Sequence, residues 1–107
     1  MDHMDLSQLM QQAQQMQSRL QEAQDALAER SVTGTAGGGV VTVEADGKGT
    51  VRKVTLDPTV VDPADVAMLE DLIVVAVADA QRKAQALQES ELGRAAGGMD
   101  LPFNLPF

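Results

Sequence analysis

The sequence has no cysteine, tryptophan or tyrosine, and it contains only one histidine and two phenylalanines. Without cysteine the chain can form no disulfide, zinc-thiolate or iron-sulfur site, and this composition fits a reducing cytoplasm. The histidine is His3, and both phenylalanines, Phe103 and Phe107, lie close to the C-terminus. The hydrophobic core must therefore be built from Val, Leu, Ile, Met and Ala.

Positive charge is scarce as well. Eight Lys and Arg residues against sixteen Asp and Glu give a formal net charge of -8. This balance disfavours bulk attraction to nucleic acid or to anionic lipid. The N-terminal segment lacks the basic start and apolar run of a secretory signal, and the longest apolar run, Leu72–Ala78, is too short to span a bilayer. We expect a soluble cytoplasmic protein without a membrane partner.

A chain of 107 residues has room for one small domain. We expect that domain to occupy residues 1–96. Residues 97–107 begin with two glycines and contain Leu-Pro-Phe twice. Because proline disrupts regular helix, we expect this segment to be a flexible tail.

The N-terminal part of the chain has the apolar pattern of a long helix. Apolar residues alternate in steps of three and four, at Leu6, Leu9, Ala13, Met16, Leu20, Ala23 and Leu27. This spacing predicts a helix over Leu6–Arg30 with one narrow apolar seam, which favours pairing with another helix over simple packing on its own domain. The helix would be roughly 38 Å long, so we expect part of it to project from the body.

The period then changes to two, which predicts three strands, Val32–Gly34, Val40–Ala45 and Thr50–Leu56. Residues 46–49, Asp-Gly-Lys-Gly, predict a tight hairpin between the last two strands, because Asp and Gly tolerate the positive φ of such turns. One face of the sheet should carry the core residues Val41, Val43, Ala45, Val54 and Leu56.

A second helix is predicted to begin at Asp62, with Pro63 at its first position and Asp65 near the positive end of its dipole, and to end at about Leu92 before Gly93. Around Ile73–Val77 the helix is apolar on nearly every side. We therefore expect it to lie between the sheet and a second copy of the chain.

The sequence offers almost no material for catalysis. Gly37–Gly39 is followed by Val40 and not by the Gly-Lys-Ser/Thr of a phosphate-binding loop. The serines have only His3 as a candidate imidazole partner, and one histidine without cysteine cannot assemble a typical zinc site. We expect no enzyme activity, no catalytic residue, no metal site and no cofactor.

Several segments occur in order along the whole chain: Leu9–Gln17, Val32–Gly34, Gly37–Val41, Leu56–Pro58, Leu69–Ile73 with Ala80, and the Leu-Pro-Phe ending. Together they resemble the YbaB/EbfC family of bacterial nucleoid-associated proteins. The resemblance implies an α+β fold, in which each subunit has the order helix-strand-strand-strand-helix and a small antiparallel sheet. It also implies a tweezer-like homodimer with projecting N-terminal helices.

The same resemblance implies a function. Members of the family bind double-stranded DNA, alter its conformation, and serve nucleoid organisation, gene regulation and DNA protection. The expected partners are double-stranded DNA, a second copy of the chain and DNA repair or replication proteins, and the expected location is the nucleoid in the cytoplasm. The alternative is an adaptor that binds repair or replication proteins and has weak or indirect DNA binding, which the net charge of -8 favours.

An acidic protein can bind DNA if its basic side chains face the phosphates and its carboxylates face away. The first candidates for DNA contact are Arg19, Arg30, Arg82, Lys83 and Arg94, and the second are Lys48, Arg52 and Lys53. Glutamines of the first helix could add uncharged hydrogen bonds. The candidates for the dimer interface are Leu20, Val41, Val43, Leu69, Leu72, Ile73, Ala76 and Val77.

Overall fold

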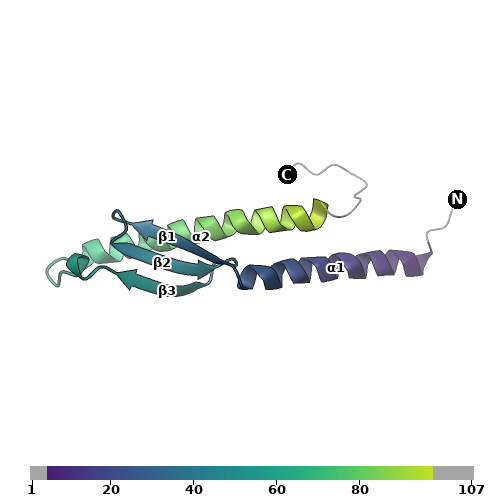
Figure 1. Cartoon of the computed structure of the whole chain (residues 1–107), viewed down its shortest axis with the longest axis horizontal. Coiled ribbons are helices and arrows are strands. Elements are labelled where there is room, and N and C mark those ends of the chain that lie inside the picture. The colour runs from purple at the N-terminus through teal and green to yellow at the C-terminus, as the bar shows by residue number, and fades with distance from the viewer. Residues whose placement is uncertain (1–4, 98–107) are drawn as a thin grey trace.

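A computed structural model describes residues 5–97 and shows one elongated unit, about 75 Å long. The elements are α1 (Leu6–Ala28), β1 (Ser31–Ala36), β2 (Val41–Asp46), β3 (Val51–Leu56), a 3-10 turn (Pro58–Val60) and α2 (Val66–Gly97) (Figure 1). This order confirms the predicted α+β fold with two helices around three strands. Most of the tail predicted over 97–107 lies outside the described residues.

The three strands form one antiparallel sheet in the order β1-β2-β3. Gly34 of β1 lies opposite Val43 of β2, and Val43 lies opposite Val54 of β3, so these three residues share one face. A bulge between Glu44 and Ala45 shifts the register of the last pair of strands. The face that carries Val43 is the face on which α2 packs.

Small residues allow α2 to lie very close to β1. Ala76, Ala80 and Ala84 are fully buried at successive turns of the helix. A Cβ atom on Gly34 would lie 2.3 Å from both the Ala76 carbonyl oxygen and the Ala80 amide nitrogen. Any side chain at residue 34 would therefore push the helix away from the sheet.

The hydrophobic core includes fewer residues of the sheet than the sequence predicted. Val41, Val43 and Ala76 are fully buried within the single chain, so they belong to its own core and present no surface to a second copy. This corrects their assignment to a dimer interface. Val54 was expected in the core as well, but it is 42% exposed, because α2 covers β1 and β2 and leaves β3 uncovered.

Both ends of α2 differ from the prediction. The helix begins at Val66, where the Asp65 carboxylate accepts a hydrogen bond from the Met68 amide at 3.2 Å. Asp62 instead accepts from the Ala64 amide in the preceding turn. Gly93 does not end the helix, which continues to Gly97, because a glycine inside a helix weakens it without breaking it.

The hairpin between β2 and β3 anchors the end of α1. The Gly47 amide donates to the carbonyl oxygens of Leu27, at 2.9 Å, and Arg30, at 3.1 Å. A Cβ atom on Gly47 would lie 2.5 Å from that Leu27 oxygen, so only glycine fits here. The positive φ of the turn occurs at Gly49, a glycine of the predicted turn segment 46–49.

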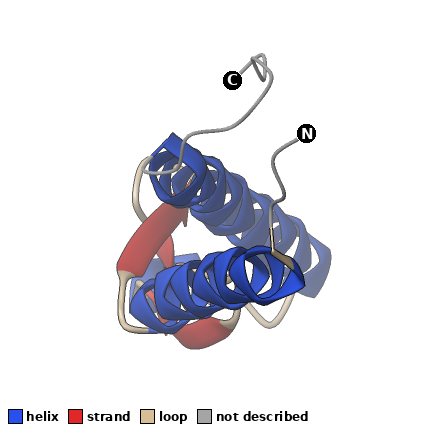
Figure 2. Ribbon diagram, turned by 90° about the vertical axis from the view of Figure 1, so that its right-hand side faces the viewer, coloured by secondary structure: helices blue, strands red, loops and turns tan. Residues whose placement is uncertain are grey.

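From this anchor α1 runs outward beside the C-terminal part of α2 (Figure 1). Figure 2 looks along the molecule from that end, and both helices run back from the viewer towards the strands. We call residues 6–30, which contain α1 and the two residues that follow it, together with residues 88–97 of α2 the arm, and the remaining residues the body.

Candidate nucleic-acid interface

All eight lysines and arginines lie in the described part of the chain, and every one is exposed. The structure separates them into three groups. The arm group is Arg19, Arg30 and Arg94, the hairpin group is Lys48, Arg52 and Lys53, and the helix pair is Arg82 and Lys83.

Two members of the arm group, Arg30 and Arg94, bond to Glu91. This carboxylate accepts from Arg30 at 3.2 Å and from Arg94 at 3.5 Å, so two guanidinium groups share one negative charge. Glu91 was not predicted, because its link to Arg30 joins residues that are far apart in the sequence. The arginine side chains remain 52% and 74% exposed, which leaves most of their donors accessible to another anion.

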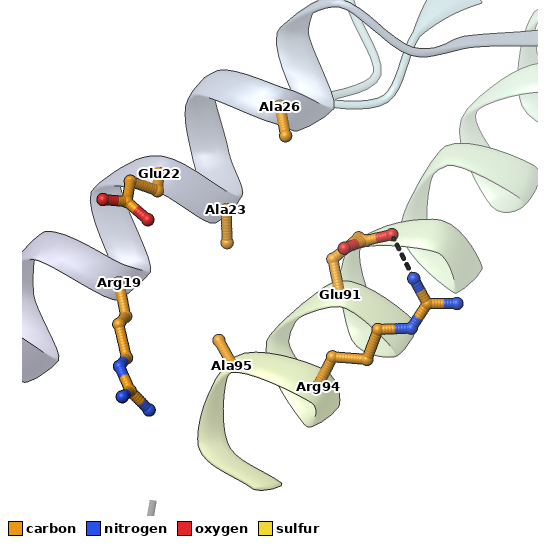
Figure 3. A pocket seen from close by; sticks show the side chains of 7 residues that line it. All are labelled: Arg19, Glu22, Ala23, Ala26, Glu91, Arg94 and Ala95. Carbon is orange, nitrogen blue, oxygen red and sulfur yellow. Dashed lines mark hydrogen bonds and ion pairs between the residues drawn. The ribbon is translucent and has the colours of Figure 1, made fainter. Parts of the chain in front are cut away.

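A groove of about 450 Å³ separates α1 from the end of α2. Figure 3 shows Arg19 and Glu22 on the α1 side, Glu91 and Arg94 on the α2 side, and three alanines, Ala23, Ala26 and Ala95, between them. The alanines leave space between the helices. Arginine presents several donors in a planar fork that suits phosphate oxygens, so the two arginines can hold a phosphate backbone at this groove.

The helix pair forms contacts within the body of the protein. The Lys83 ammonium donates to the Thr33 carbonyl at 2.8 Å, and the Asp79 carboxylate accepts from the Thr35 amide at 3.1 Å. Arg82 and Lys83 also form ion pairs with Asp79. The hydrogen bond from the Thr35 amide, followed by those from Arg82 and Lys83, lowers the pKa of Asp79 to about 2. Lys83 and Asp79 thus bind the outer edge of β1.

Two members of the hairpin group also form hydrogen bonds within the protein. Arg52 donates to the Asp46 carboxylate at 2.9 Å, and Asp46 accepts in addition from the amides of Lys48 and Thr50. The Thr50 hydrogen bond, with smaller contributions from Arg52 and Lys48, lowers the pKa of Asp46 although burial opposes this. Lys48 lies beside Gln24 and Gln88, which places it at the base of the arm.

Residues 5–97 contain neither a metal site nor a membrane-spanning helix. No three His, Asp or Glu side chains in that range come together as metal ligands. Neither of the helices described there is both long enough and apolar enough to cross a membrane.

Residues 1–99 match the model of the YbaB/EbfC DNA-binding family. The chain belongs to the YbaB/EbfC family. Its family is defined by DNA binding and not by a catalysed reaction.

Relatives in this family carry the name nucleoid-associated protein. One from Gemmatimonas aurantiaca is 49% identical over 104 residues, which cover 97% of this chain and all of the relative. One from Chloroflexus aurantiacus is 51% identical, covering 90% of this chain and 96% of the relative. One from Mycolicibacterium vanbaalenii is 55% identical, covering 89% of this chain and 86% of the relative.

A solved structure supports the fold. An uncharacterized protein from Helicobacter pylori superposes with a TM-score of 0.75 at 21% sequence identity, covering 86% of this chain and 97% of the other. At this identity the similarity concerns the fold alone.

Proposed function

We propose that this protein is a nucleoid-associated homodimer that binds double-stranded DNA through its arms and alters the conformation of the DNA. The observation that carries the proposal is the gathering of Arg19, Arg30 and Arg94 on the arm from distant parts of the sequence. Membership of a DNA-binding family supports DNA as the ligand. Nucleoid organisation, gene regulation and DNA protection are the roles that such binding would serve in the cytoplasm.

The distribution of acidic residues supports the arm as the DNA-binding region. Six acidic and two basic residues between positions 57 and 87, all in the body, give that segment a net charge of -4. Five of these carboxylates are exposed at the body end, on Asp57, Asp62, Asp65, Glu70 and Asp71. DNA that approached the arm would therefore avoid the strongest repulsion.

The proposed contacts favour binding with little sequence preference. Arginines that touch phosphates hold the duplex in place but do not distinguish base pairs. Specific recognition requires side chains at the base edges in a groove, and a group of three arginines engaged with phosphates supplies none.

The uncovered strand β3 supports a homodimer. Val51 and Val54 face the same side of the sheet as the core but remain 37% and 42% exposed, and Val74 and Val75 of α2 are 66% and 55% exposed. Exposed apolar groups of this kind favour a protein contact. Leu69, Leu72, Ile73 and Val77 are half-buried beside the core, and they remain candidates for the rim of this interface, with Leu20 on α1.

The test is a fluorescence-anisotropy titration of a random DNA duplex with purified protein. Arg19→Ala/Arg94→Ala should weaken binding about tenfold or more, because each arm loses two phosphate contacts. The matched control is Lys53→Ala/Arg82→Ala, which removes the same charge away from the arm groove and should change affinity less than about threefold.

Equal losses in the two variants would show that only net charge matters and would contradict the arm as the site. No binding of the unmodified protein at low salt would remove the DNA function itself and favour the adaptor for repair or replication proteins.

A further inference from the structure

The outer half of α1, residues 6–18, is unlike the rest of the molecule, and we call it the arm tip. It contains no charged residue, although the whole chain carries a net charge of -8. Its polar residues are six glutamines and two serines. Because it has no Lys or Arg, the arm tip cannot supply charged contacts to DNA phosphates.

The apolar residues of the arm tip are exposed except for Met16, which is half-buried. Leu6 is 70% exposed, Leu9 45% and Met10 57%. The groove between the helices begins further inward, where Arg19 and Ala23 face Arg94 and Ala95. Within residues 5–97, α2 therefore accompanies the inner half of α1 but not the arm tip (Figure 1).

The exposed residues continue the apolar seam of α1, whose inner residues are already packed within the molecule. At its inner end the same stripe contains Leu27, which is only 3% exposed, and the half-buried Leu20 and Ala23. The stripe keeps its alternation of three and four residues out to Leu6. A seam with this spacing is the pattern by which one helix packs against another along its length.

We propose that the arm tip binds the arm tip of a second copy of this chain, helix against helix, along the seam of Leu6, Leu9, Ala13 and Met16. The absence of charge on the arm tip favours a second copy of the same segment as its partner. Two molecules of charge -8 repel each other, and two neutral segments are the surfaces on which they can meet at the least electrostatic cost. The pairing would also bury the exposed leucines and support a short helix that is marginal in water by itself.

This contact would add to the proposed function, because a homodimer that holds DNA near the base of its arms and contacts a copy in another homodimer at their tips can link two DNA segments. The glutamines on the opposite side of the arm tip stay exposed. The linking role rests on the proposed DNA binding, but the contact between tips can be measured without DNA.

The chain has no cysteine, so a single introduced thiol can form a disulfide only with another copy. Ala13 lies on the seam near the middle of the arm tip, where two copies would meet whether the helices run parallel or antiparallel. The control position is Gln11, on the opposite side of the helix. Each full-length variant, Ala13→Cys and Gln11→Cys, is oxidised with a fixed amount of diamide, which takes the electrons and protons of two thiols as they form one disulfide.

Ala13→Cys should cross-link about tenfold faster than Gln11→Cys on a denaturing gel without reductant. Adding Leu6→Gln/Leu9→Gln should remove that advantage, whereas Gln11→Ala/Gln14→Ala, with the same spacing on the opposite face, should preserve it. Helix content, followed by circular dichroism, checks that all variants fold.

Equal rates for the two thiol positions, or an advantage that survives Leu6→Gln/Leu9→Gln, would overturn the proposal. It would also be overturned if Ala13→Cys cross-linked only after deletion of residues 98–107, because the tail would then be what covers the seam. DNA anisotropy of Leu6→Gln/Leu9→Gln keeps the two proposals separate: loss of cross-linking with intact DNA binding concerns only the contact between tips.

Discussion

The two outer strands of the sheet, β1 and β3, differ in how they contact α2. At β1, the Thr33 carbonyl and the Thr35 amide are bonded by Lys83 and Asp79 of α2. At β3, α2 is absent, and Val51 and Val54 are exposed on the side that forms the core elsewhere. An open strand edge is prone to unwanted pairing. The chain therefore closes one outer strand of its sheet and leaves the apolar side chains of the other exposed.

The difference begins with residue size. On the face that α2 covers, β1 carries Gly34 and Ala36, whereas β3 carries Val51 and Val54. Small side chains allow the alanines of α2 to approach β1. One helix is too narrow to cover three strands, so the strand with the larger apolar side chains remains uncovered until a second layer is added.

The largest expected effect comes from Gly34→Ala, which would break the close contact at β1. The new Cβ atom would lie within 2.3 Å of the α2 backbone, so the helix must move. We expect a loss of about 3 kcal/mol in the free energy of unfolding, measured by urea denaturation. The control is Gly93→Ala on α2, where a Cβ meets nothing within 4 Å and should stabilise the helix by about 1 kcal/mol. Similar results for both glycines would contradict the account of β1.

The next effect concerns β3. Val54→Lys places a charge on the exposed apolar face and should weaken self-association at least about tenfold, because the lysine would be desolvated in the dimer. Sedimentation velocity over a range of protein concentrations measures this, and the fold of the single chain should persist. Thr55→Lys puts the same charge on the opposite face of β3 and should leave association unchanged. A dimer that tolerates Val54→Lys would show that β3 is not the interface.

The smallest effect is a dependence on pH at β1. Asp79 has its pKa lowered from 3.8 to about 2, so its contribution to stability is complete above pH 4 and is lost as the pH falls towards 2. Asp79→Asn keeps an oxygen for the Thr35 amide but removes the charge. The variant should be less stable than the unmodified protein at pH 7, and the difference should shrink between pH 4 and pH 2. Urea denaturation at both ends of this range measures it, and a difference that stays constant would contradict the charge as its cause.

Much of the fold could be predicted from local patterns. Three signals involve only residues that are close in the sequence: the apolar seam of α1, the alternation in β2 and the residues of the hairpin turn. Each element predicted from such a signal is present in the structure. The boundaries of α2 were less accurate, because Asp62 and Asp65 are both good caps and each accepts a hydrogen bond from a nearby amide.

The candidate site was less predictable. The sequence identified all the basic residues as candidates, but it did not identify the carboxylates and carbonyls to which they bond. The contact of Asp79 with Arg82 and Lys83 has a visible signal, the spacing of three and four residues on one helix. No such signal exists for Arg30 with Glu91, or for Lys83 with the Thr33 carbonyl, because these contacts join distant segments. The separation of the arm group from the helix pair therefore required the structure.

The most direct test of DNA binding by the arms is the salt dependence of the affinity for a random duplex. Three arginines in each of two copies correspond to about six phosphate contacts, so the logarithm of the association constant should fall against the logarithm of salt concentration with a slope of about -5. Between 50 and 200 mM salt the affinity should fall about 10³-fold. A slope near zero, or no saturable binding at the lowest salt, would contradict the claim that the arm arginines of this acidic protein hold DNA by its phosphates.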